Sequence, residues 1–75
     1  MAKKQDIHVV PSDEGWKVVR EGQDRAIARA RTQKEAELRG RQVAKNDKVE
    51  FNLHGKDGRV REKDSYGNDP RRTKG

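Results

Sequence analysis

The strongest constraint on the fold is a strand–turn–strand pattern in residues 49–63. Apolar and polar residues alternate along 49–54, which predicts a β-strand with one buried face. The Gly-Lys-Asp-Gly sequence at 55–58 is typical of a hairpin turn, with Gly58 in a conformation of positive φ. Residues 59–63 hold one apolar residue among charged ones, as expected for a solvent-exposed edge strand. The pattern predicts a C-terminal β-hairpin.

Upstream of this hairpin the sequence predicts three short strands and a helix. The strands are expected at residues 6–10, 16–21 and 25–30, which are short β-branched or alternating runs separated by Gly- and Pro-containing turns. Thr-Gln-Lys-Glu at 32–35 has the form of a capping box, so we expect a helix over 33–45. The predicted fold class is α+β: a three-stranded antiparallel meander, one helix packed on the sheet, and then a hairpin that extends the sheet.

The inward face of the predicted helix is made of small residues, with Gly40 at its middle. A glycine inside a helix costs about 1 kcal/mol relative to alanine. Its presence therefore indicates that the helix axis lies very close to the sheet. The core is expected to contain Trp16, Val18, Val43, Phe51 and Leu53.

Length and composition bound the rest of the interpretation. The chain has 75 residues, of which 28% are hydrophobic and 43% charged, so we expect one domain with a thin core at 6–66. The ends, 1–5 and 67–75, are expected to be flexible and basic. The chain has no cysteine to staple it, and self-association into a homodimer remains open. Without an apolar run of membrane-spanning length, we expect a cytoplasmic protein.

Several segments resemble the small bacterial proteins grouped as domain of unknown function 2188. These segments are His-Val-Val-Pro at 8–11, Gly-Trp-Lys-Val at 15–18, Thr-Gln-Lys-Glu-Ala at 32–36 and the whole of 54–70. The last segment is the most specific, because Gly, Asp and Tyr recur in it at fixed offsets. The similarity covers about residues 7–70. It implies a bacterial or phage origin and a shared fold, and it implies no activity.

Metal and cofactor sites are weakly indicated. If the first and fourth strands are neighbours, His8 and His54 could approach and bind a metal together with a carboxylate, but two histidines alone are more simply polar strand residues. Asp64, Asn68 and Asp69 do not have the spacing of an EF-hand and are better explained as turn formers. We therefore expect no metal and no cofactor.

Catalysis is not expected either. Both serines lie in turn-forming contexts, and the chain contains neither a Gly-x-Ser-x-Gly elbow nor a phosphate-binding glycine loop. A water-excluding active site is also hard to build in a domain with so thin a core.

The net charge of +6 makes nucleic acid the first partner to consider. Residues 6–66 contain 14 Lys and Arg against 12 Asp and Glu, so +2 belongs to the expected domain and +4 to the ends. The sequence predicts weak, nonspecific electrostatic binding of nucleic acid. The candidate residues lie on the helix, the hairpin and the C-terminal end: Lys34, Arg41, Lys45, Arg59, Arg61, Arg71 and Arg72.

The alternative function is a protein-interaction or self-associating module. It would act through the edge strand at 59–63 or through the helix face around Leu38.

Overall fold

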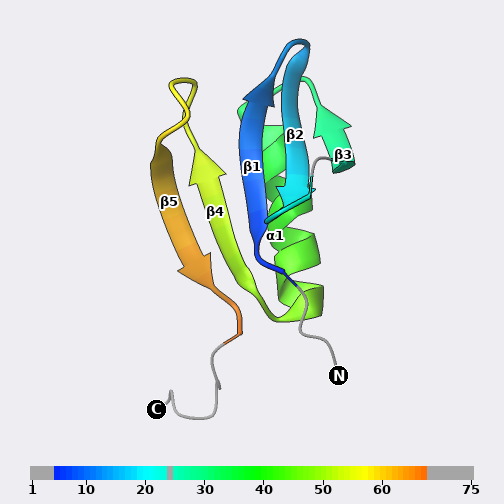
Figure 1. Cartoon of the computed structure of the whole chain (residues 1–75), viewed down its shortest axis with the longest axis vertical. Helices are drawn as coiled ribbons and strands as arrows, with labels where there is room; N and C mark the ends of the chain where they lie inside the picture. The colour runs from blue at the N-terminus through cyan, green and yellow to red at the C-terminus, as the bar shows by residue number, and fades with distance from the viewer. Residues whose placement is uncertain (1–4, 24, 68–75) are drawn as a thin grey trace.

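The computed structural model describes residues 5–23 and 25–67, which form five strands and one helix (Figure 1). The elements are β1 (Ile7–Ser12), β2 (Gly15–Arg20), β3 (Ala26–Ala30), α1 (Gln33–Asp47), β4 (Glu50–His54) and β5 (Val60–Ser65). Each predicted strand and the predicted helix is present, with ends shifted by one or two residues. Of the predicted flexible ends, 1–4 and 68–75 lie outside the described residues.

The strands form one mixed sheet in the order β3-β2-β1-β4-β5, covered on one face by α1. The prediction of an α+β domain with one helix on a sheet is therefore confirmed. The predicted arrangement of the strands, a three-stranded antiparallel meander followed by a hairpin that extends the sheet, differs from the observed mixed sheet. β4 pairs with β1, not with β3, and it does so in parallel. The physical reason is the helix, which carries the chain from β3 back across the sheet and lets β4 run in the same direction as β1.

The core lies between α1 and the three strands β2, β1 and β4. Trp16, Val18, Phe51 and Leu53 are buried as predicted, whereas Val43 is only half-buried. The predicted core omitted Ile7 and Val9, which are fully buried. They face α1 from the central strand, where Ile7 is paired with Phe51 and Val9 with Leu53.

The predicted close approach of helix and sheet is confirmed at Gly40. A Cβ atom at this position would lie 2.8 Å from a ring carbon of Phe51 and 2.8 Å from a methyl group of Val9. The Thr32 hydroxyl caps the helix by accepting from the amide of Glu35, as the capping box predicts. The helix ends later than expected, because Lys48 takes the left-handed conformation at φ 58°. No helix in the described part of the chain has the length and apolarity needed to cross a membrane.

Different turns and element ends lie at the two ends of the sheet. At the upper end in Figure 1 lie the β1–β2 turn, the end of β3, the start of α1 and the β4–β5 turn. We call this the hairpin end. Three connections lie there, β1–β2, β3–α1 and β4–β5, so it is the place where sequence-distant side chains can act jointly.

Candidate functional site

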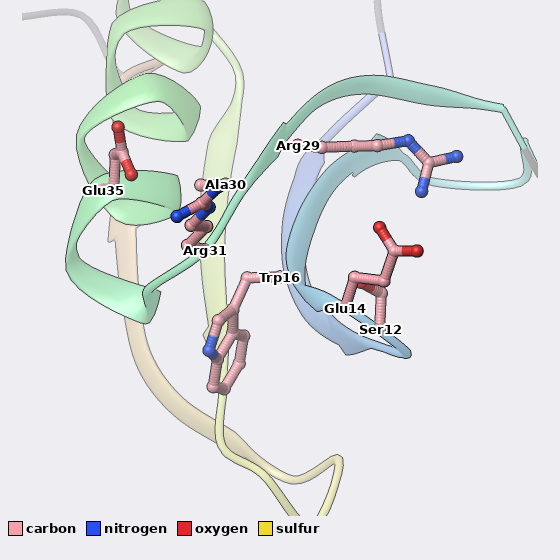
Figure 2. Close-up of a pocket in the computed structure, with 7 residues that line it drawn as sticks. All are labelled: Ser12, Glu14, Trp16, Arg29, Ala30, Arg31 and Glu35. Atoms are coloured by element: carbon pink, nitrogen blue, oxygen red, sulfur yellow. The ribbon is translucent and has the colours of Figure 1, made fainter.

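The hairpin end carries an open hollow built around the β1–β2 turn. Its volume is about 570 Å³, within the range of ligand-binding clefts. The residues that line it are shown in Figure 2: Ser12, Glu14, Trp16, Arg29, Ala30, Arg31 and Glu35. Two adjoining hollows share residues with it and add Lys17 on one side and Lys56 on the other.

Trp16 lines two of these hollows, at the point where β2 starts tightly against the end of β3. Gly15 has φ 140°, and a Cβ atom there would lie 2.5 Å from the carbonyl oxygen of Ala30. Only glycine fits such a close approach. Trp16 is then paired with Ala30 across the sheet and is only 7% exposed, with its indole N–H bonded to no described residue. The indole N–H is thus an available hydrogen-bond donor in the wall of the hollow.

Four cations line the three hollows, and we call them the hairpin-end cations: Lys17, Arg29, Arg31 and Lys56. None of them is ion-paired within the part of the chain that the structure describes. In Figure 2 the side chains of Glu14 and Arg29 point toward one another, but no ion pair joins them. Unpaired guanidinium and ammonium groups keep their donors available for an external anion.

The start of α1 adds to the positive field at the hairpin end. Residue 33 opens the helix two positions after Arg31, and the N-terminus of a helix carries a partial positive charge. The side-chain amide of Gln33 donates to the carbonyl oxygen of His54 at 3.1 Å, which ties this helix end to β4. Three carboxylates, Asp13, Glu14 and Glu35, line the same hollows and offset part of the charge.

The predicted nucleic-acid residues do not form one surface. Lys34, in the first turn of α1, and Arg59, in the β4–β5 turn, are exposed and belong to elements at the hairpin end, with Arg59 3.9 Å from Asp57. Arg41 and Lys45 lie toward the middle and end of α1. Arg71 and Arg72 lie outside the described residues. The hairpin-end cations Arg29 and Arg31 were not predicted, although both alternate with alanine along and just beyond β3.

The basic side chains in and just before β5 are interrupted by a bulge. Leu53 is paired with Glu62, but His54 is paired with Val60, so Arg61 is an extra residue in the strand. Strict alternation of side chains between the two faces is lost there. The stem of Arg61 packs over Gly55, where a Cβ atom would lie 2.8 Å from its Cδ atom. Arg59, Arg61 and Lys63 are therefore not evenly spaced on one face.

The guanidinium group of Arg41 is hydrogen-bonded to other side chains of the protein. It donates to Glu37 at 2.9 Å, to Glu62 at 3.0 Å and to the Tyr66 hydroxyl at 2.8 Å, and it also contacts Asp64. Burial alone would lower the pKa of Arg41, but the hydrogen bonds outweigh it and raise the pKa above its usual value. A phosphate group would have to compete with these partners, so nucleic-acid binding by Arg41 remains a prediction without structural support.

The same residue connects β5 to the helix. Arg41 reaches from α1 across the ring of Phe51, with its central guanidinium carbon 4.6 Å from the ring centre, to Glu62 and Asp64 on β5. Beside it, the ammonium group of Lys45 lies 5.7 Å from the ring centre of Tyr66. β5 is exposed at all six positions and has no further strand on its outer side in the described part of the chain. Arg41 is therefore the main clamp on an otherwise uncovered edge strand.

Replacing Arg41 with methionine is expected to loosen β5 selectively. Methionine retains an apolar cover for Phe51 but removes every polar bond to Glu62 and Asp64. Amide hydrogen exchange should become faster along β5, while β1 and β2 keep their protection. Replacing exposed Arg39 with methionine is the control, since Arg39 is also on α1 but is bonded to no residue of β5 within the described ranges. Equal exchange at β5 in the two variants would contradict the clamp.

The predicted approach of His8 and His54 is confirmed, because the parallel pairing of β1 and β4 places the two rings in contact. The nitrogen atoms His8 Nδ1 and His54 Nε2 lie 2.9 Å apart. Among the described residues, however, no group of three or more His, Cys, Asp or Glu side chains is arranged to hold a metal ion. The contact is a hydrogen bond between rings.

Comparison with known proteins identifies a family for the fold. The model of the family described as "Uncharacterized protein conserved in bacteria (DUF2188)" matches residues 7–66. These residues include every strand and the helix that the structure describes. No curated protein and no solved structure matches the chain significantly.

Proposed function

Since the chain belongs to the DUF2188 family of uncharacterized proteins conserved in bacteria, we propose its function from its geometry. It is a non-catalytic module that binds nucleic-acid phosphates electrostatically through the hairpin end. The observation that supports this proposal is the set of four hairpin-end cations, which have no ion pair within the described residues. Arg20 and Arg41, by contrast, are neutralised by carboxylates of the fold.

The geometry favours contacts to the phosphate backbone over base reading. The hairpin-end cations come from strand ends and turns, and no exposed helix face among the described residues presents them to a groove. Stacking on bases needs an accessible ring, whereas Trp16 and Phe51 are buried and Tyr66 is half-buried. Phosphate contacts position a protein but carry no sequence information directly. We therefore expect similar affinity for different sequences.

Self-association through β5 is disfavoured by its charges. In a symmetric antiparallel pair of identical strands, the two-fold axis passes through one residue pair, and residues equally far from it on either side meet. With the axis at Glu62, Arg61 meets Lys63; with the axis at Lys63, Glu62 meets Asp64. Like charges placed opposite each other destabilise a sheet. The helix face around Leu38, which is 62% exposed, offers a single apolar residue.

Replacing Arg29 and Arg31 together with alanine is expected to weaken nucleic-acid binding. Fluorescence anisotropy with labelled duplex DNA and with RNA, at about 50 to 200 mM salt, measures affinity and its salt dependence. The slope of log affinity against log salt should become shallower by about one unit for each phosphate group that the variant no longer binds. The wild-type protein should bind unrelated sequences with similar affinity.

The control removes the same charge elsewhere. Arg25 and Arg39 are exposed and line none of the three hollows, so their double alanine variant should bind nearly as the wild type does. An equal loss in both double variants would show that only net charge matters. No binding even at about 50 mM salt would refute the proposal, and light scattering would then test the interaction-module alternative.

A further inference from the structure

A chain of hydrogen bonds runs across the sheet face that α1 leaves open. The carboxylate oxygen Glu21 Oε1 lies 2.9 Å from His8 Nε2, and His8 Nδ1 lies 2.9 Å from His54 Nε2. The other nitrogen of His54, Nδ1, lies 2.8 Å from the carbonyl oxygen of Gly58. The chain joins the end of β2, β1, β4 and the β4–β5 turn.

The two outer partners fix where the hydrogens are. A carbonyl oxygen can only accept, so His54 Nδ1 must carry a hydrogen, and an ionised carboxylate likewise requires one on His8 Nε2. Each neutral imidazole has a single N–H. If both rings were neutral, the two facing nitrogens would both be bare. Three hydrogen bonds need three hydrogens, and two neutral imidazoles supply two.

The rings are positioned for a proton between them. The ring centres are 5.1 Å apart, and the facing nitrogen atoms are 2.9 Å apart. The difference between these distances is about one ring radius for each of the two rings. The facing nitrogens therefore lie close to the line between the ring centres. Their lone pairs point at each other and do not converge on a third atom, as two ligands of one metal ion would.

We propose that His8 and His54 form one shared proton-binding site that is complete when it holds a single added proton. With that proton, all three hydrogen bonds are made and the added charge is balanced by Glu21. Loss of the proton breaks one of the three bonds, and a second proton places N–H opposite N–H. The site therefore stabilises the fold over an intermediate pH range and less on either side. This inference does not depend on the proposed nucleic-acid function.

Other charged groups on this face could titrate or act on the pair. By strand register, Lys17 and Arg29 share the face from β2 and β3, Glu50 from β4 and Lys63 from β5. The adjoining β4–β5 turn carries Lys56, Asp57 and Arg59. None of these side chains is hydrogen-bonded to either ring in the described part of the chain. The residues paired with the two histidines in the neighbouring strands are uncharged: Val19, Asn52 and Val60.

Replacing Glu21 with glutamine distinguishes a proton shared by the two rings from an ordinary ion pair between His8 and Glu21. The amide NH₂ of glutamine can donate to His8 Nε2, which lets His8 Nδ1–H donate to His54 while both rings are neutral. All three hydrogen bonds are then made without the added proton. From about pH 5 to 9, a range that spans histidine titration, the thermal midpoint Tm of the wild type should pass through a maximum and fall on the alkaline side. The Glu21→Gln variant should lack that fall, so the two curves cross.

The matched control is Glu14→Gln, which makes the same charge change at an exposed residue that is not hydrogen-bonded to either ring. Its Tm curve should run parallel to that of the wild type. Nuclear magnetic resonance of the wild-type imidazoles gives a second readout, in which the signals of both rings should change together when the shared proton is lost. Parallel Tm curves for wild type and Glu21→Gln, or two independent steps for the two rings, would overturn the proposal.

Discussion

Replacing Phe51 with alanine is expected to remove most of the protein's stability. Phe51 is fully buried on β4, under Gly40 of α1 and next to Ile7 of β1. Deleting a buried phenylalanine side chain costs about 3–5 kcal/mol, through lost burial and the cavity that remains. Small domains have only about 5–15 kcal/mol of stability in total, and a thin core belongs at the lower end of that range.

Urea unfolding followed by circular dichroism measures this loss. Leu38→Ala is the matched control, because it also removes a large apolar side chain but from a position that is 62% exposed. Its midpoint should stay close to that of the wild type. A Phe51→Ala protein with a wild-type midpoint would mean that the core is not centred on β4.

The local elements could be predicted because their signals are local. The hairpin turn at Gly58, which has φ 88°, and the cap at Thr32 each depend on a few adjacent residues. Gly40 is the exception, because it predicted a contact between helix and sheet, which are distant in the sequence. A glycine in mid-helix is unfavourable unless something packs against it. The strand order could not be predicted, because the parallel pairing of β1 with β4 depends on where the helix returns the chain.

The candidate site was harder to predict than the fold, for the same reason. Arg41 was predicted to bind nucleic acid, yet its long side chain reaches from the flank of α1 to carboxylates on β5. Arg29 and Arg31 could not be singled out, because their significance depends on the packing of Gly15 against the end of β3. A charge pattern shows how many cations a chain has, whereas the fold decides which of them are neutralised internally.

Replacing Gly40 with alanine is expected to destabilise the protein, although helix propensity alone predicts the opposite. Alanine is favoured over glycine in a helix by about 1 kcal/mol. The added Cβ atom, however, would lie 2.8 Å from both Phe51 and Val9, which are fully buried and cannot move aside into solvent. Forcing an extra carbon into a filled core typically costs about 1–3 kcal/mol, which exceeds the propensity gain over most of that range. Gly40→Val, with two further methyl groups, should cost more.

Chemical denaturation of Gly40→Ala and Gly40→Val tests this against Gln42→Ala, an exposed substitution on the same helix that should change little. Unfolding midpoints should fall in the order wild type, Gly40→Ala, Gly40→Val. A more stable Gly40→Ala protein would show that α1 can shift away from β1 and β4 at little cost. The small-residue face of α1 would then reflect loose packing, and the close contact between helix and sheet would not be what fixes the position of α1.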